Sequence, residues 1–321
     1  MEIIARGGDG FYHPKNEAEL CALVASAYEN KRKLRVRGSA HSVAEAIYTD
    51  GFTGRGEPPP AAIEVMLDQY HKVTITPDPQ DPTHATVEVD AGCHLGKDPY
   101  DPTGTSTWER SLNGKLQKAG YALDDLGGIT HQTIAGFIAT GSSGGTLRYS
   151  AYDSIVRLRL IDGKGAVHDL RRNDPDPARR DMFFAAGVSM GLLGVVSKVW
   201  LRVGPSFNLL GKQTTGSTET LPIDFFGPGE PGKPSLADYL AKAPYARLMW
   251  WPQLGFRRMQ VWESARVETM PGFTPNPYQE LGSDPDLASL AGSLFYTIIG
   301  NLDDLSVVPG KLEHWFQHLE G

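Results

Sequence analysis

The stretch that decides the fold reads Val36-Arg37-Gly38-Ser39-Ala40-His41-Ser42. It begins in an alternating run, Leu34–Arg37, that predicts a short strand, and it turns at Gly38 into small residues. Small residues let an anion approach the backbone closely, and consecutive N–H groups in such a turn form a concave anion site. The turn is therefore a candidate site for a phosphate-containing ligand.

Two later stretches are similarly rich in small residues. The first runs from Gly127 to Gly145, and its hydroxyls and exposed amides around a short predicted helix suit a pyrophosphate. The second, Gly187–Val196, is a glycine-spaced turn that leads into a β-branched strand. A single glycine-rich turn is usually only a turn. The order and spacing of the three stretches are therefore more informative than any one of them.

The surrounding pattern mixes helices with short strands. Asn16 and Glu19 form a capping box that opens a helix over 16–31, and Ser106 with Glu109 opens another that ends at Gly120. The remaining pattern predicts strands over 61–66, 72–76 and 85–89, a hairpin over 154–170, a helix over 179–186 and a strand over 195–203. Because regular βαβ alternation is lacking, we expect the α+β class.

The amino-acid composition changes after Gly204-Pro205. Residues 205–235 are rich in Gly, Pro, Thr and Ser, which predicts a linker or domain entry. Beyond it, 246–251 and 258–264 predict strands and 285–300 predicts a helix. We therefore expect a domain boundary near 205, with domains at 1–204 and 205–321.

Composition excludes several partners. The formal net charge of −7 argues against a nucleic-acid or anionic-membrane partner, because phosphate surfaces would repel the average field. Two cysteines among 321 residues exclude a disulfide scaffold and suit a reducing compartment. The N-terminus lacks signal-peptide features, and no apolar run approaches the roughly 20 residues of a membrane helix. We expect a soluble cytoplasmic protein.

Three other kinds of site fit the sequence less well. Gly187-Val188-Ser189-Met190-Gly191 is formally a G-x-S-x-G motif, but a hydrolase elbow follows a strand and opens a helix, whereas here the predicted helix comes first. No G-x-G-x-x-G at a strand–helix turn and no Walker loop is present, which disfavours a Rossmann dehydrogenase. Without H-E-x-x-H or paired C-x-x-C motifs, no metal site is expected.

Together, the three small-residue stretches resemble the FAD-binding domain of the vanillyl-alcohol-oxidase (PCMH-type) superfamily, most closely its sugar-lactone and alditol oxidase branch. Over residues 10–203, Val87–Gly92 is similar to the family's V-x-A-G strand, Gln132–Gly145 to its T-I-A-G-x-I-x-T-G segment and Gly191–Val203 to its G-x-L-G-V-V turn. The resemblance implies a flavin domain of two α+β subdomains with FAD between them, followed by the start of an α+β substrate or cap domain.

The resemblance also implies which residues bind FAD. His41 is expected to attach covalently to the flavin 8α carbon, which suits the nucleophilicity of a neutral imidazole. Main-chain groups of Arg37–Ala40 and Ser42 are expected to hold the pyrophosphate, and those of 194–196 to meet the adenine end. The full expected set is Val36, Arg37, Gly38, Ser39, Ala40, His41, Ser42, Gly128, Thr133, Gly136, Thr140, Gly141, Ser142, Ser143, Gly194, Val195 and Val196.

The implied activity is oxidation of a CH–OH group in a polyol, sugar lactone or related alcohol. Hydride would pass to flavin N5, with O2 as the expected acceptor and H2O2 as product. The alternatives are an FAD-dependent dehydrogenase with another acceptor, or a flavin-binding subunit that needs a second chain. Catalytic residues stay unassigned, because the family's C-terminal His-Trp-Gly segment is missing from the sequence. Either the gene product is truncated, or a second polypeptide completes the site.

The sequence departs from the family pattern at two points, and several of the candidate residues also have ordinary structural interpretations. The family often has a histidine at the position of Ser143, and the 127–145 segment contains no cysteine for a second flavin link. On pattern alone, His41 is a loop histidine with an ordinary hydrogen bond and His131 orients a turn. Cys93 is interpreted as a small buried hydrophobe, and the tryptophans at 250, 251 and 262 as core residues on paired strands.

Overall fold

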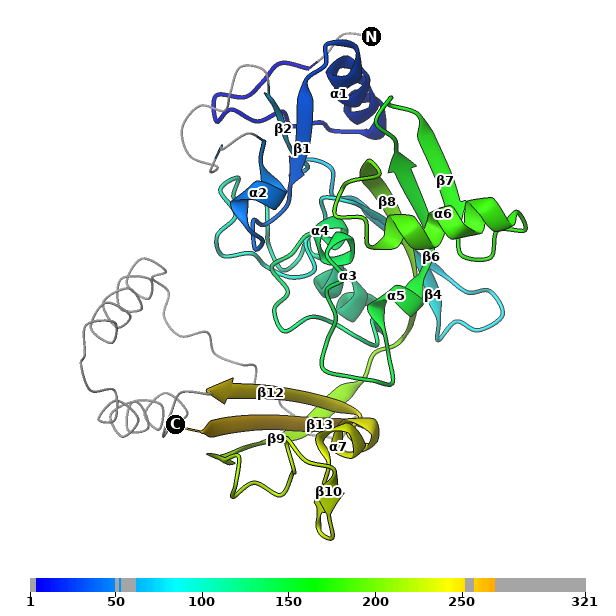
Figure 1. The fold of residues 1–321 in the computed structure, drawn as a ribbon. Helices are drawn as coiled ribbons and strands as arrows, with labels where there is room; N and C mark the ends of the chain where they lie inside the picture. Colours follow the sequence, from blue (N-terminus) through cyan, green and yellow to red (C-terminus); the bar gives the residue numbers. More distant parts are fainter. Residues whose placement is uncertain (1–3, 50–51, 53–61, 252–256, 269–321) are drawn as a thin grey trace, which may run out of the picture. The chain divides into compact units, whose positions relative to one another are not determined.

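The computed structural model describes residues 4–49, 52, 62–251 and 257–268. The chain divides into two compact units, Met1–Ser206 and Phe207–Gly321 (Figure 1). Helices and strands are mixed in both units, so the α+β class is confirmed. The helix expected at 285–300 lies outside the described residues. Among the described helices, none has the length and apolar character needed to cross a membrane.

A small subdomain opens the first unit. Helix α1 (Glu17–Glu29) begins at Asn16, whose side chain accepts from the Glu19 N–H as predicted. Strands β1 (Lys33–Arg37) and β2 (Ala62–Met66) pair in parallel, and the short helix α2 (Ala44–Ile47) follows β1. The apolar face of α1 packs on this pair through a cluster that includes Leu20, Leu23, Val24, Ala27, Ile63 and Val65.

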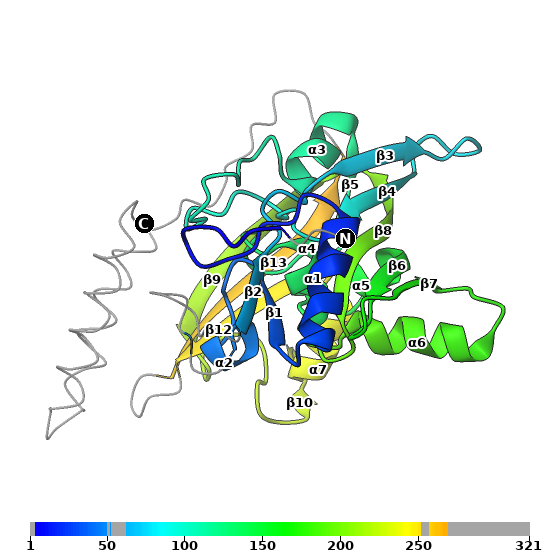
Figure 2. The same cartoon turned by 90° about the horizontal axis from the view of Figure 1, so that it is seen from above.

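A six-stranded antiparallel sheet forms the second subdomain. Its order is β3 (Val73–Pro77), β4 (Ala85–Asp90), β8 (Val195–Pro205), β6 (Ile155–Ile161) and β7 (Val167–Arg171), and β5 (Tyr121–Ala122) also pairs with β8. Helices α3 (Leu112–Ala119), α4 (Ile134–Ala139), α5 (Ala151–Ser154) and α6 (Pro177–Gly187) complete it. Helix α6 lies along β7 (Figures 1 and 2).

The two subdomains share side chains at their junction. Ala135 of α4 packs against the hydrophobic clusters of both, and Ile161 of β6 is buried in the α1 cluster. Glu17 of α1 forms an ion pair with Arg159 and accepts a hydrogen bond from Ser197 on the sheet. The first unit is therefore one packed body in which α4 lies where the subdomains meet.

One helix start is wrong in the sequence prediction. Helix α3 begins at its N-cap Ser111, whose side chain accepts from the Gly114 N–H, and not at Ser106. The Ser106 hydroxyl instead accepts from the Asp98 N–H, so it belongs to an irregular turn. The predicted end is confirmed, because Gly120 adopts a left-handed backbone with φ of +83°.

The second unit contains a three-stranded antiparallel sheet in the order β12 (Tyr245–Trp251), β13 (Arg258–Val267), β9 (Asn208–Ser217). Helix α7 (Leu236–Lys242) packs on it through a cluster of Leu221, Ile223, Phe225, Met259 and Val261, and two short strands, β10 (Gly229–Glu230) and β11 (Lys233–Pro234), pair nearby. Residues 208–217 were expected to be linker but form β9. Trp250, expected in a core, is 48% exposed.

Candidate functional site

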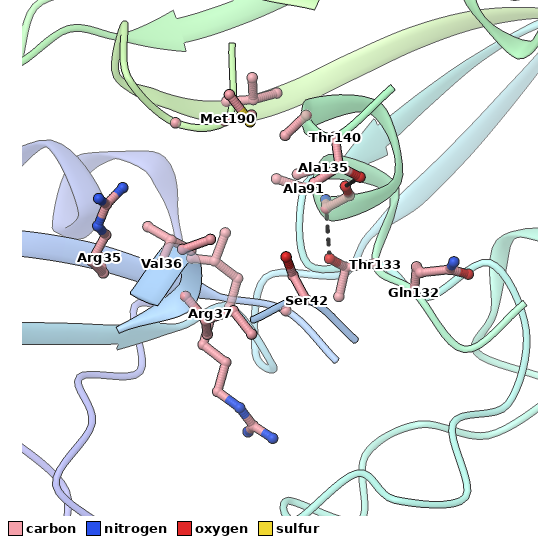
Figure 3. A pocket seen from close by; sticks show the side chains of 18 of the residues that line it. Arg35, Val36, Arg37, Ser42, Ala91, Gln132, Thr133, Ala135, Thr140 and Met190 are labelled. Atoms are coloured by element: carbon pink, nitrogen blue, oxygen red, sulfur yellow. Dashed lines mark hydrogen bonds between the residues drawn. The ribbon is translucent and has the colours of Figure 1, made fainter. Parts of the chain in front are cut away.

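The three small-residue stretches meet around one cavity of about 460 Å³ in the first unit. Specific small-molecule sites commonly have volumes of this order. Its walls come from the end of β1 with the loop that follows, from α4, and from the turn that precedes β8 (Figure 3). Leu67, Ala91 and Gly92 also line the cavity.

Most of the residues predicted from the sequence line this cavity. They are Val36, Arg37, Gly38, Ser39, Ala40, His41, Ser42, Thr133, Gly136, Thr140, Ser142, Gly194, Val195 and Val196. Gly128, Gly141 and Ser143 are not among its lining residues. The Ser143 hydroxyl instead donates to Asp125, and Gly141 closes the end of α4 with a left-handed backbone, φ +69°.

The 38–42 loop offers a row of backbone hydrogen-bond donors. Among the interactions of the described residues, none is donated by the N–H groups of Ser39, Ala40, His41 or Ser42. Ala40 has a φ of +57°, a conformation in which successive amides can point to one side of the chain. A Cβ on Gly38 would lie 2.6 Å from Thr133 Oγ1, so only glycine lets the loop pass this close to α4. The loop therefore fits an anion.

The first turn of α4 makes a different contribution. Thr133 caps it by accepting from the Gly136 N–H at 3.3 Å (Figure 3). The Ile134 and Ala135 N–H groups donate to the carbonyls of Cys93 and Ala91. Because these amides already have carbonyl partners, they do not form the helix-terminal anion site that the sequence predicted. Helix α4 instead contributes part of the cavity wall and the Thr133 hydroxyl.

The third wall is the turn between α6 and β8. Met190 has a φ of +49° and its N–H donates to the Ala139 carbonyl, which joins this turn to α4. Gly194 has a φ of +139°, and a Cβ there would lie 2.1 Å from the Ile161 carbonyl oxygen. Ser189 is 8% exposed, and its turn follows a helix and precedes a strand, as predicted. A hydrolase elbow has the opposite order, a strand followed by a helix, so Ser189 does not lie on a hydrolase elbow.

Arg37 brings a cation to the cavity wall. Its guanidinium donates from Nη1 to the Met66 sulfur at 3.7 Å and lies 6.0 Å from the Phe11 ring centroid, while its buried Nε has no hydrogen-bond partner within the described part of the chain. Arg35 and Arg37 point in opposite directions from β1 in Figure 3. No carboxylate partner of Arg37 is found among the described residues, so its charge favours an anionic ligand in the cavity.

His41 belongs to a cluster with His131 and Asp98. One ring nitrogen from each histidine and one Asp98 carboxylate oxygen all lie within 4.8 Å of one another. The His41 and His131 ring centroids are 5.4 Å apart, and the Ser39 hydroxyl donates to the His131 carbonyl at 2.6 Å. His41 is exposed toward the cavity, whereas His131 and Asp98 are 8% and 4% exposed.

Burial lowers the pKa of His41, with Asp98 opposing this effect and His131 adding to it. The imidazole is therefore neutral near pH 7, the form in which a ring nitrogen is nucleophilic. Two imidazoles and a carboxylate are donor types that zinc also accepts, but a structural zinc site closes with four protein ligands and this group offers three.

The cavity suits an FAD molecule on these observations. It has free amides and an arginine for a pyrophosphate, a neutral histidine for the flavin, and apolar walls for planar rings. Ala91 and Gly92 lie within the V-x-A-G strand that the sequence identified, but they were not predicted to line the site. A signal was present, because a Cβ on Gly92 would lie 1.9 Å from the Leu67 carbonyl. Asp98 was missed, since no local pattern marks it.

Comparison with known proteins agrees with the cavity. Residues 107–171 match a family model described as an FAD binding domain. The chain is 30% identical over 212 residues to D-arabinono-1,4-lactone oxidase of Eremothecium gossypii, covering 66% of this chain and 34% of that protein. It is also 30% identical over 197 residues to L-gulono-1,4-lactone dehydrogenase of Mycobacterium tuberculosis, covering 61% of this chain and 38% of that protein. The chain thus spans little more than a third of these relatives.

The fold has known neighbours as well. Cholesterol oxidase from Brevibacterium sterolicum aligns with a TM-score of 0.69 at 17% sequence identity, over 96% of this chain and 54% of that one. The fold and the matched region together define an FAD-binding flavoprotein domain of the PCMH type. Within that class, the chain is similar in sequence to sugar-lactone oxidases over about two-thirds of its own length.

Proposed function

We propose that the chain is the FAD-binding part of an oxidoreductase that oxidises a CH–OH group of a sugar lactone or a related polyol. The observation that carries the proposal is the meeting of three sequence-distant stretches around one cavity. The sugar-lactone relatives support the substrate class. FAD supplies the hydride acceptor when bound, and the protein supplies position and electrostatics.

In this proposal, each wall of the cavity has one task. The N–H groups of residues 39–42 and the Arg37 side chain hold the pyrophosphate, which is supported by their having no carboxylate or carbonyl partner among the residues that the structure describes. Thr133, Gly136, Thr140 and Ser142 line the opposite wall. Main-chain groups of Gly194–Val196 meet the adenine end. Residues 205–321 begin a substrate domain, and residues 1–204 form the flavin domain.

We further propose that His41 bonds covalently to the flavin. Its place on the cavity wall and its lowered pKa support this, because attack needs a neutral ring nitrogen. The test is an absorption spectrum before and after acid precipitation, beside a His41→Ala variant. Yellow colour retained in the wild-type pellet and lost from the variant pellet is expected. Flavin released by acid from both proteins would contradict the covalent bond and leave FAD binding intact.

The proposed activity is tested by steady-state turnover with a panel of aldonolactones and alditols. Under air, H2O2 production is expected with O2 as the acceptor. Turnover with an artificial dye but not with O2 would favour the dehydrogenase alternative, which the mycobacterial relative supports. Bound flavin without any turnover by the chain alone would favour a subunit that works with a second polypeptide. A protein that takes up no FAD would contradict the whole proposal.

We also propose a cytoplasmic location. Its support is cysteine chemistry: Cys21 and Cys93 are both free, and burial raises the pKa of Cys93 to about 12, which keeps that thiol unreactive. Cell fractionation with antibodies against the chain tests this location. Recovery in a membrane or extracellular fraction would contradict it.

A further inference from the structure

Asp98 is a buried carboxylate whose surroundings are dominated by histidines. Its side chain is 2% exposed, and its Oδ1 accepts from the Tyr100 N–H at 3.0 Å. Within the described residues its ion-pair partner is His94, with Nε2 3.8 Å from Oδ2. Burial lowers the pKa of His94, so that partner is largely neutral near pH 7. Burial of a carboxylate costs free energy unless a cation offsets its charge, and a neutral His94 leaves most of that cost in place.

The other two neighbours of Asp98 are His41 and His131. One atom of each of the three side chains lies within 4.8 Å of the other two. A small movement of the exposed His41 side chain, or one bridging water, would bring these atoms into hydrogen-bond contact. The Tyr100 ring packs edge-on to His131 at 6.0 Å, and the Ser39 hydroxyl holds the His131 carbonyl. Asp98 and His131 are therefore held by the fold, whereas His41 faces the cavity.

We propose that Asp98, with His131, takes up the proton that His41 loses when it bonds to the flavin, and so positions and activates His41 for attachment. This inference rests on the proposed covalent bond at His41. In that reaction one imidazole N–H bond and one 8α C–H bond break and one N–C bond forms. The 8α proton and the two electrons would pass to the isoalloxazine, and O2 would reoxidise the ring by taking two electrons and two protons, one of them from solvent, to leave as H2O2. The imidazole proton passes to the Asp98 carboxylate, directly or through His131.

The chemistry calls for such an acceptor. A neutral imidazole that forms a third bond becomes cationic unless its other ring nitrogen releases a proton. A buried carboxylate nearby lowers the energy of that cation and then accepts the proton. General bases placed in this way contribute about 10²–10⁴-fold to a rate. Within the described residues, Asp98 is the carboxylate that lies in this position relative to His41.

The test uses the full chain produced without flavin and then mixed with FAD. Two quantities are followed: reversible FAD binding by flavin fluorescence, and acid-stable flavin as a function of time. For Asp98→Asn, which keeps the shape but removes the charge, we expect unchanged FAD affinity and attachment about 100-fold slower. For Asp98→Ala, added sodium formate should restore the rate in proportion to its concentration, an effect that a structural role would not produce.

Asp81→Asn is the matched control, because Asp81 pairs with His84 at 2.7 Å on an exposed loop and neither residue lines the cavity. It should attach FAD at the wild-type rate. An Asp98→Asn protein that also attaches FAD at that rate would overturn the inference. If Asp98→Asn binds no FAD at all, the rate of attachment is measured in His131→Gln instead. A slow rate supports the inference, and the wild-type rate overturns it. One equivalent of zinc in the purified protein, lost in Asp98→Asn, would also overturn it.

Failure of the inference and failure of the proposed function give different results. Wild-type protein that binds FAD but releases all of it in acid contradicts the bond at His41 itself. Wild-type protein with acid-stable flavin, beside an unimpaired Asp98→Asn, contradicts only the role of Asp98.

Discussion

At the residue scale, the reactivity of His41 depends on its protonation. Burial lowers its pKa below the ordinary value of 6.5. Because the neutral imidazole is the reactive form, the rate of covalent FAD attachment should be flat through neutral pH and should fall only below that value. The measurement is the initial rate of acid-stable flavin formation between about pH 5 and about pH 8. A rate that is already falling at neutral pH would contradict the environment described for His41.

That residues 36–42 line the cavity could be predicted from sequence, because the pattern that marks them is local. Small side chains and a turn after a strand are visible as neighbours in the chain, and the cavity lies beside them. Asp98 could not be predicted in this way. Its importance comes from the fold, which brings a carboxylate from one loop to histidines in two others. Gly141 and Ser143 show the converse, since a matching motif placed them in the site and the structure uses them for internal contacts.

At the element scale, the turn before β8 depends on glycine at 194. Its φ of +139° and the 2.1 Å approach to the Ile161 carbonyl leave no room for a Cβ. Gly194→Ala should therefore lower the free energy of unfolding by about 1–3 kcal/mol from backbone strain, with a further loss from the clash, and should weaken FAD binding. Gly163→Ala, in the β6–β7 turn with open space around the Cβ, is the matched control and should be near neutral. Chemical denaturation of both variants gives the comparison, and equal stabilities would contradict the described turn.

Helices and strands with strong periodicity were predicted well, and boundaries set by tertiary contacts were not. Asn16 caps α1 because its partner Glu19 is local. Ser106 had the same local pattern, but the fold uses its hydroxyl to hold the Asp98 backbone, and Ser111 caps α3 instead. Strand β9 was missed because its Gly, Thr and Ser residues resemble a linker, and its pairing with β13 is formed with a distant segment.

At the scale of the whole molecule, the first unit joins two subdomains through α1, α4 and the sheet. Ala135, Ile161 and the Glu17–Arg159 pair all cross the junction, and the cavity draws lining residues from both sides. A dinucleotide bound there would contact both subdomains at once. We therefore propose that this cavity holds FAD, with the flavin at His41.

Peptide mapping by mass spectrometry tests that claim most directly. Protein purified with its flavin, or loaded with FAD, is digested and searched for the peptide that carries flavin. We expect one flavinylated peptide, the one containing His41, and none in His41→Ala. Flavin on a peptide from outside the cavity wall, or a loaded protein in which the His41 peptide is unmodified, would contradict it.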